Sequence, residues 1–253
     1  MSLNSPAQIR AAFKWRSGMN SQVHFRIFLL IVIVLITGVQ VRELGYINAA
    51  HLAYRTHFSD PRKIREYFNT HTVRKLQLGA GLNNPDGWLN SDIEPTKTQI
   101  YLDAVGPYPF ADGSFHYIFA EHLIEHLTWE NGLAMLKECR RVLVPGGIIR
   151  IITPNLIKNV ELLSRYDAEA KELMAAHRRL FGWPDTPVMA AYILNKEVRE
   201  WGHQFIYDPT TLRQTLALAG FREIQQYAVD RKTDPAFTKA GYRTPDLEGC
   251  LDH

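Results

Sequence analysis

Cysteine is scarce in this 253-residue chain, which contains only Cys139 and Cys250. Two cysteines alone cannot build a disulfide framework or a cysteine-based zinc site, so a reducing compartment is the simpler interpretation. Internal repeats and low-complexity tracts are also lacking. Hydrophobic residues (46%) and charged residues (22%) occur at ordinary globular levels, which excludes disordered, collagen-like and coiled-coil chains. The length suits one α/β domain with an appendage.

The main body of the chain lacks an excess of positive charge. Residues 1–42 contain five Lys or Arg and no acidic residue, and without these five the chain has 24 basic against 26 acidic residues. Residues 43–253 therefore have a net charge of −2 and no bulk attraction for a phosphate backbone. We expect no nucleic-acid partner.

No uncharged run reaches the length of a membrane-spanning helix. The longest covers residues 27–41, and its apolar part, IFLLIVIVLITGV at residues 27–39, would form a helix of about 20 Å, against about 30 Å of bilayer hydrocarbon. Three interpretations stay open. A helix over residues 27–41 associates with a membrane, which we favour, or it packs on the main domain, or the segment is a cleaved targeting peptide.

The remaining pattern predicts three segments: a basic N-terminal segment (1–45), helices that lead into the domain (46–70) and the domain itself (71–253). Short apolar runs bounded by turn residues predict strands at 75–78, 88–93, 100–104, 117–120, 148–153 and 221–229. Helical spacing predicts helices at 129–142 and 210–219, and a helical insertion over 156–200 with a break at Trp183-Pro184. Strands alternating with such connections predict an α/β fold with a doubly wound, mostly parallel sheet.

The residues that indicate chemistry follow the predicted strands. The first strand runs into Gly79-Ala80-Gly81, where glycines let the backbone approach a ligand closely. The third glycine of a dinucleotide fingerprint is missing, which disfavours NAD. Asp92 ends the next strand, where a carboxylate can accept both hydroxyls of a ribose, and Asp103 ends the third, where it can meet an adenine amino group.

Three stretches, LQLGAG, YPFADGSFHYIFAEHLIEHL and ECRRVLVPGGIIRIITPN, occur in this order, and WGHQFIYDPTTLRQTLALAGF follows them. From about Arg74 onward the chain resembles the class I S-adenosylmethionine-dependent methyltransferases, and within them the bacterial type-11-like group often associated with cell-surface polysaccharide synthesis. The resemblance implies a Rossmann-like sheet and S-adenosylmethionine as cofactor. The residues it assigns to the cofactor site are Gly79, Ala80 and Gly81 for the methionyl part, Asp92 for the ribose, Asp103 for the adenine, and Glu121 and His122 on the other side.

Two departures from the family pattern affect the fold. Only about eleven residues separate Gly81 from Asp92, so the first crossover helix is expected to be shortened or lost, and with it a helix N-terminus for the cofactor's carboxylate. The chain also shows no apolar run of strand length between Asp246 and His253, so the family's seventh strand is expected to be missing.

The motif His122-Leu-Ile-Glu-His126 allows another interpretation. It matches H-x-x-E-H, which on an α-helix places both histidines on one face, as in inverted zinc peptidases. In the methyltransferase family, however, Glu-His is ordinary after the fourth strand, so we assign no metal ligand. A catalytically inactive scaffold with the methyltransferase fold is the third alternative.

Within the methyltransferase interpretation, His203 and His122 are the candidate general bases, because an imidazole can take a hydroxyl proton near neutral pH. The helical insertion is expected to cover the acceptor pocket with aromatic side chains. No Asn/Asp-Pro-Pro-Tyr motif follows the fourth strand, so we expect the acceptor to be a hydroxyl of a small molecule or glycan. A cytosolic cofactor indicates a cytoplasmic protein, and any attachment through residues 27–41 would be to the inner face of a membrane.

Overall fold

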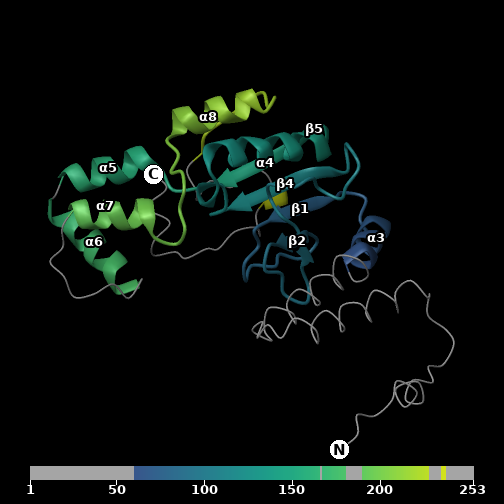
Figure 1. Cartoon of the computed structure of the whole chain (residues 1–253), viewed down its shortest axis with the longest axis horizontal. Helices are drawn as coiled ribbons and strands as arrows, with labels where there is room; N and C mark the ends of the chain where they lie inside the picture. The colour runs from purple at the N-terminus through teal and green to yellow at the C-terminus, as the bar shows by residue number, and fades with distance from the viewer. Residues whose placement is uncertain (1–59, 166, 181–189, 228–234, 238–253) are drawn as a thin grey trace, which may run out of the picture. The chain divides into compact units, whose positions relative to one another are not determined.

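The computed structural model describes residues 60–165, 167–180, 190–227 and 235–237 (Figure 1). All of these belong to one compact unit formed by residues 52–253. In this described part of the chain, no helix is long and apolar enough to cross a bilayer. The expected apolar helix at 27–41, the Trp183-Pro184 break and the expected loss of a seventh strand after residue 237 all lie outside the described residues.

The centre of the domain is a five-stranded parallel sheet with the order β3-β2-β1-β4-β5. Its strands are β1 (Lys75–Leu78), β2 (Leu89–Asp92), β3 (Ile100–Tyr101), β4 (Phe115–Glu121) and β5 (Leu143–Ile152). The strand order reverses between β1 and β4, and in such sheets the ligand crevice lies outside the carboxyl ends of the strands at this point. The predicted α/β fold with a parallel Rossmann-like sheet is confirmed.

The sixth predicted strand is wrong over its described residues, because 221–227 have no strand conformation. Two local features explain this. Glu223 has a φ of 54°, which breaks an extended run, and the Arg213 guanidinium donates a hydrogen bond to the carbonyl of Ile224. The third strand is also shorter than predicted, because it ends at Tyr101 rather than Ala104.

The connection from β1 to β2 contains only turns and bends over residues 79–88, so the expected loss of the first crossover helix is confirmed. Trp88 fills the space beneath this loop and packs edge-on against Phe119 of β4. Phe237 completes this small aromatic cluster with a ring 5.8 Å from that of Trp88. The loop is therefore held by packing on one side of the sheet.

Helices α3 (Asp60–Thr70) and α4 (Trp129–Val142) contact the sheet, and α8 (Pro209–Leu218) packs against α4 (Figure 1). The side chain of Thr128 caps α4, and the predicted bounds of this helix are those observed. Trp129 Nε1 donates to Thr215 Oγ1 of α8 at 3.0 Å, which joins the two helices. Buried Leu136, Cys139 and Val142 of α4 belong to the main hydrophobic core.

The predicted insertion between the fifth strand and the Trp201 region consists, in its described residues, of α5 (Leu156–Arg165), α6 (Ala168–Leu180) and α7 (Ala190–Arg199). Helix α5 packs against both α6 and α7 (Figure 1). The backbone N–H of Leu156 donates to the carbonyl of Tyr207 at 2.9 Å. The start of the insertion is thereby attached to the chain that follows its end.

Candidate active site

The turn after β1 has the backbone that its glycines predict. Gly79 and Gly81 have φ values of 59° and 52°, in the left-handed region that L side chains rarely adopt. A Cβ added to Gly79 would lie 3.0 Å from Cδ1 of Leu123, so this turn packs tightly against the segment after β4. Ala80, which lies between them, is buried and donates its N–H to the carbonyl of Ser91 at 2.9 Å.

The structure brings Asp92 directly to this turn. Its Oδ2 accepts the N–H of Gly81 at 2.8 Å, and its Oδ1 accepts the N–H of Glu94 at 2.9 Å. Each carboxylate oxygen has a second lone pair, so a ribose hydroxyl can still bind here. The carboxylate therefore fits the predicted role and also fixes the glycine turn.

Gln99 is a residue of this site that the sequence did not reveal. Its side chain is fully buried, and Nε2 donates to the carbonyl of Gly81 at 2.7 Å while Oε1 accepts the N–H of Thr96. It therefore braces the glycine turn from the β2–β3 connection. A glutamine before a short apolar strand gives no signal of this role.

Asp103 lies two residues beyond the end of β3 and is exposed. Its Oδ1 accepts the N–H of Val105 at 2.9 Å, which orders the turn that follows. Like Asp92, it lies at the carboxyl edge of the parallel sheet, where an adenine would be bound.

Glu121 ends β4, and His122 follows it with a φ of 48°. The N–H of His122 donates to the carbonyl of Ile152 at 2.9 Å, which ties the carboxyl end of β4 to that of β5. The His122 side chain is about half exposed (51%), and its Nδ1 lies 3.0 Å from Oε1 of Glu125.

Glu125 is a fully buried acidic residue that lies next to this strand end. Its second oxygen, Oε2, accepts the hydroxyl of Thr153 at 2.9 Å. Its backbone carbonyl accepts the N–H groups of Gln204 and Phe205. The segment after β4 and the segment after α7 are therefore fastened together around this carboxylate.

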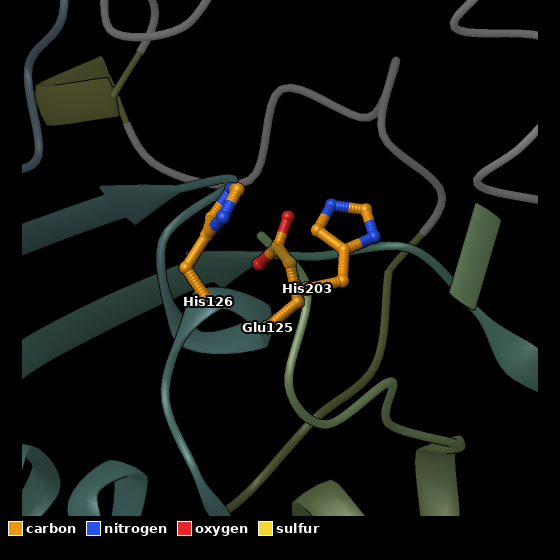
Figure 2. Close-up of side chains that lie close together, drawn as sticks. All are labelled: Glu125, His126 and His203. Atoms are coloured by element: carbon orange, nitrogen blue, oxygen red, sulfur yellow. The ribbon is translucent and has the colours of Figure 1, made fainter. Parts of the chain in front are cut away.

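Two imidazoles lie beside the Glu125 carboxylate, one from each of these segments (Figure 2). The rings of His126 and His203 meet edge to face with their centroids 4.9 Å apart. His203 Nδ1 lies 2.5 Å from the carbonyl of Glu197, and because a carbonyl only accepts, Nδ1 holds the proton and a neutral ring has its lone pair on Nε2. Burial lowers the pKa of His126, so this ring is neutral near neutral pH.

Glu197, on α7, is a further titratable group of this region. Burial raises the pKa of its carboxyl group to about 7, and the nearby His122 opposes this shift. Perturbed carboxyl groups of this kind are common in functional sites. Nothing in the sequence distinguishes Glu197 from the other acidic residues of the insertion.

The structure does not form the helix on which the zinc-peptidase alternative depends. Residues Ile124–His126 form a single 3₁₀ turn, η3, and His122 lies before it in the left-handed region. His122 and His126 are therefore not successive residues of one α-helical face. His126 pairs instead with His203, from a distant part of the sequence.

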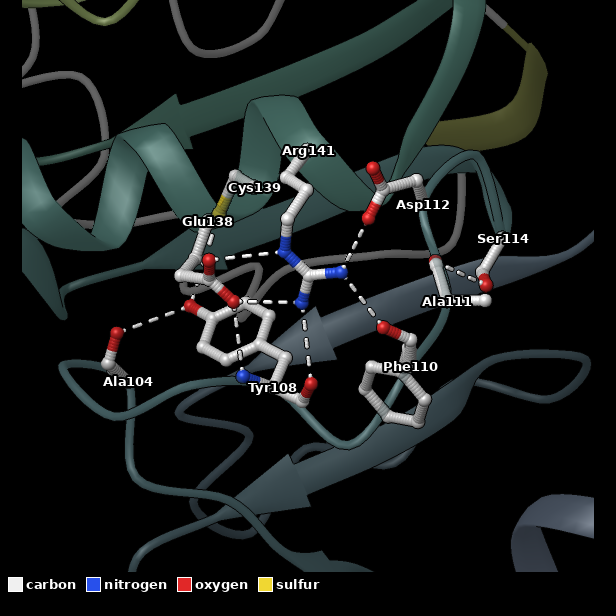
Figure 3. A network of polar contacts seen from close by, with 9 residues as sticks. All are labelled: Ala104, Tyr108, Phe110, Ala111, Asp112, Ser114, Glu138, Cys139 and Arg141. Atoms are coloured by element: carbon white, nitrogen blue, oxygen red, sulfur yellow. Dashed lines mark hydrogen bonds and ion pairs between the residues drawn. The ribbon is translucent and has the colours of Figure 1, made fainter.

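A polar network around Arg141 holds the chain segment that leads into β4 (Figure 3). Its guanidinium donates to the carbonyls of Tyr108 and Phe110 and to the carboxylates of Asp112 and Glu138. These contacts join the end of α4 to the Tyr-Pro-Phe-Ala-Asp stretch. Hydrogen bonds of Arg141 therefore connect two of the stretches quoted from the sequence, YPFADGSFHYIFAEHLIEHL and ECRRVLVPGGIIRIITPN.

The methyltransferase domain family matches residues 89–151, from β2 to β5. A solved SAM-dependent methyltransferase from Archaeoglobus fulgidus is similar at 19% identity and a TM-score of 0.40, over 65% of this chain and 67% of that one. A phosphoethanolamine N-methyltransferase of Haemonchus contortus, solved with S-adenosyl-L-methionine, is similar at 15% identity and a TM-score of 0.37, over 66% and 38%. No curated protein sequence matches the chain.

The family match covers YPFADGSFHYIFAEHLIEHL and most of ECRRVLVPGGIIRIITPN, whereas LQLGAG precedes it. The glycine turn and Asp92 meet at the switch point of a parallel sheet. The zinc-peptidase alternative lacks its helix. Residues 89–151 therefore match a methyltransferase domain, and S-adenosylmethionine is the cofactor of that family.

Proposed function

We propose that the chain methylates a hydroxyl group of a small molecule or a glycan, and that His203 takes the hydroxyl proton. The observation that carries this proposal is the hydrogen bond from His203 Nδ1 to the carbonyl of Glu197. It fixes the ring in the tautomer whose Nε2 can accept a proton. His122, at the end of β4, is the second candidate base.

The cofactor would be held by the residues at the carboxyl edge of the sheet: Gly79, Ala80, Gly81, Asp92, Asp103, Glu121 and His122. S-adenosylmethionine supplies a methyl group that is already activated on a sulfonium. The protein therefore needs mainly to align the acceptor oxygen, remove its proton and exclude water. The lone pairs that Asp92 retains beside its two backbone contacts support the ribose role.

In the reaction, the acceptor oxygen forms a bond to the methyl group as the sulfur–methyl bond breaks and its electron pair stays on sulfur. The hydroxyl proton passes to Nε2 of His203. The absence of an Asn/Asp-Pro-Pro-Tyr motif after β4 favours oxygen over a flat amino group as the acceptor. Trp201 supports a sugar ring as part of the acceptor, because it is 43% exposed and its ring lies 5.5 Å from that of His203.

The test is methyl transfer from labelled S-adenosylmethionine to a panel of hydroxyl acceptors, with calorimetry of cofactor binding alongside. We expect His203→Ala to lower turnover about 100-fold or more and to leave cofactor affinity nearly unchanged. His71→Ala, which removes a histidine at the end of α3, is the matched control. Normal turnover of His203→Ala would show that this residue only supports the fold.

Two other outcomes decide between function classes. If the protein shows no binding of S-adenosylmethionine at all, the scaffold alternative replaces the enzyme. If it methylates nucleic acid and no hydroxyl acceptor of the panel, the proposed substrate class is wrong.

We also propose that the protein is cytoplasmic and attaches to the inner face of a membrane through residues 27–41. The thirteen uncharged residues 27–39 support this, because such an apolar run beside Arg26 and Arg42 suits a helix at a lipid surface. A glycan acceptor that is carried on a lipid would be presented at the same surface.

A further inference from the structure

Glu125, His126 and His203 form a cluster with the composition of a metal site. One ligand atom from each of the three side chains lies within 4.8 Å of the others, and the carboxylate lies beside both rings (Figure 2). Two imidazoles and one carboxylate form a donor set that binds zinc, iron or cobalt in proteins.

Hydrogen bonds to the backbone hold both histidines of the cluster. His203 donates Nδ1–H to the carbonyl of Glu197, and a ring N–H of His126 is hydrogen-bonded to the backbone of Trp201. Each histidine is therefore held through one nitrogen while the other remains available as a ligand. Outer contacts of this kind, from imidazole to backbone carbonyl, are a regular feature of metal-binding histidines.

The carboxylate is oriented in the same way. Oε1 of Glu125 contacts Nδ1 of His122 at 3.0 Å, and Oε2 accepts the hydroxyl of Thr153 at 2.9 Å. Each oxygen keeps one lone pair, so the group can ligate a cation without losing either contact. Glu125 is fully buried, and a divalent cation would also offset the free-energy cost of removing its negative charge from water.

We propose that Glu125, His126 and His203 bind one divalent transition-metal ion of the zinc type. Ligand atoms around a tetrahedral zinc lie about 3.3 Å apart at bond lengths of about 2.0–2.1 Å. The ligand atoms of the three side chains lie within 4.8 Å of one another, so metal binding must shorten these distances by up to about 1.5 Å. Three protein ligands leave a fourth position open, as in catalytic rather than structural zinc sites.

The open position gives the site a role that rests on the proposed function. An acceptor hydroxyl bound there loses its proton more readily, because the cation stabilises the alkoxide. The oxygen–methyl bond then forms as the sulfur–methyl bond breaks, with the electron pair left on sulfur. Nε2 of His203 would then be a metal ligand in place of the base proposed above, and the hydroxyl proton would leave to solvent.

The test uses full-length protein freed of metal by dialysis against a chelator and titrated with Co²⁺. We expect a saturable visible absorption from one Co²⁺ per chain. His126→Gln and His203→Gln should each weaken Co²⁺ binding at least about 100-fold, while His71→Gln should leave it unchanged. Calorimetry with S-adenosylmethionine checks that each variant keeps its fold.

The outcomes separate the metal site from the proposed function. Absence of Co²⁺ absorption, or Co²⁺ binding that persists in both cluster variants, overturns the metal site whatever the methylation assay gives. Stoichiometric Co²⁺ binding that both variants lose supports the site, even if no hydroxyl acceptor is methylated and the proposed function fails. Methyl transfer that persists in chelator-treated protein rejects the catalytic role of the metal.

Discussion

Asp92 provides the sharpest test of the proposed cofactor site, because its carboxylate has a structural role and, in our proposal, also binds the ribose. Asp92→Ala removes the acceptor of two backbone N–H groups, at 2.8 Å from Gly81 and 2.9 Å from Glu94. Hydrogen bonds to a charged group contribute about 1.5–3 kcal/mol each, but Gly81 and Glu94 are exposed, so water replaces part of this loss.

We therefore expect the variant to fold and to bind S-adenosylmethionine more weakly by about 1–3 kcal/mol, which raises Kd roughly 5- to 150-fold. Isothermal titration calorimetry measures the change directly. The matched control is Asp86→Ala, an exposed acidic residue of the same loop, which should leave Kd unchanged. An unaltered Kd in a folded Asp92→Ala protein would refute the ribose assignment.

Three further predictions test the glycine turn, a helix cap and the N-terminal segment. Gly79→Ala should lower the free energy of unfolding more than Gly87→Ala does, because both glycines have a positive φ but only at Gly79 would an added Cβ meet Leu123. Urea titration measures the difference, and equal losses would reject the contact with Leu123. The pKa of Asp208 is lowered chiefly by the hydrogen bond that its carboxylate accepts from the hydroxyl of Thr211 in α8. This cap should add about 1 kcal/mol to the free energy of unfolding above pH 4, and the contribution should be lost as the pH falls through the folded-state pKa. Asp208→Asn should abolish this acid dependence in unfolding titrations. Deleting residues 1–45 should move the protein from the membrane to the soluble fraction with cofactor affinity unchanged; a full-length protein that is wholly soluble without detergent would reject the anchor.

The elements that the sequence predicts best are those determined by local pattern. Helix α4 has its predicted bounds because its apolar residues repeat at helical spacing and Thr128 caps it. The meeting of the glycine turn with Asp92 was predictable because the turn follows β1 and Asp92 ends β2, and parallel strands bring their carboxyl ends to one edge.

The cluster of Glu125, His126 and His203 could not be predicted in this way. Sequence spacing alone suggests an α-helix that pairs His122 with His126, whereas the left-handed backbone of His122 limits the segment to one 3₁₀ turn. His203 reaches the cluster only because the long helical insertion returns the chain to this edge of the sheet. Such tertiary meetings leave no periodic signal in the sequence.

The attachment of the insertion at both ends has an evolutionary consequence. Its first helix begins where Leu156 is bonded to Tyr207, and the chain after its last helix is bonded to the carbonyl of Glu125 through Gln204 and Phe205. The two ends thus lie side by side on the core, and surface segments with adjacent ends tolerate replacement. The three helices can diverge in length and sequence, or be exchanged in the laboratory as one cassette, as long as a backbone carbonyl remains in the place of that of Glu197 to accept from His203. Under the proposed function, such an exchange would alter which acceptor is received while the sheet and its glycine turn stay constant.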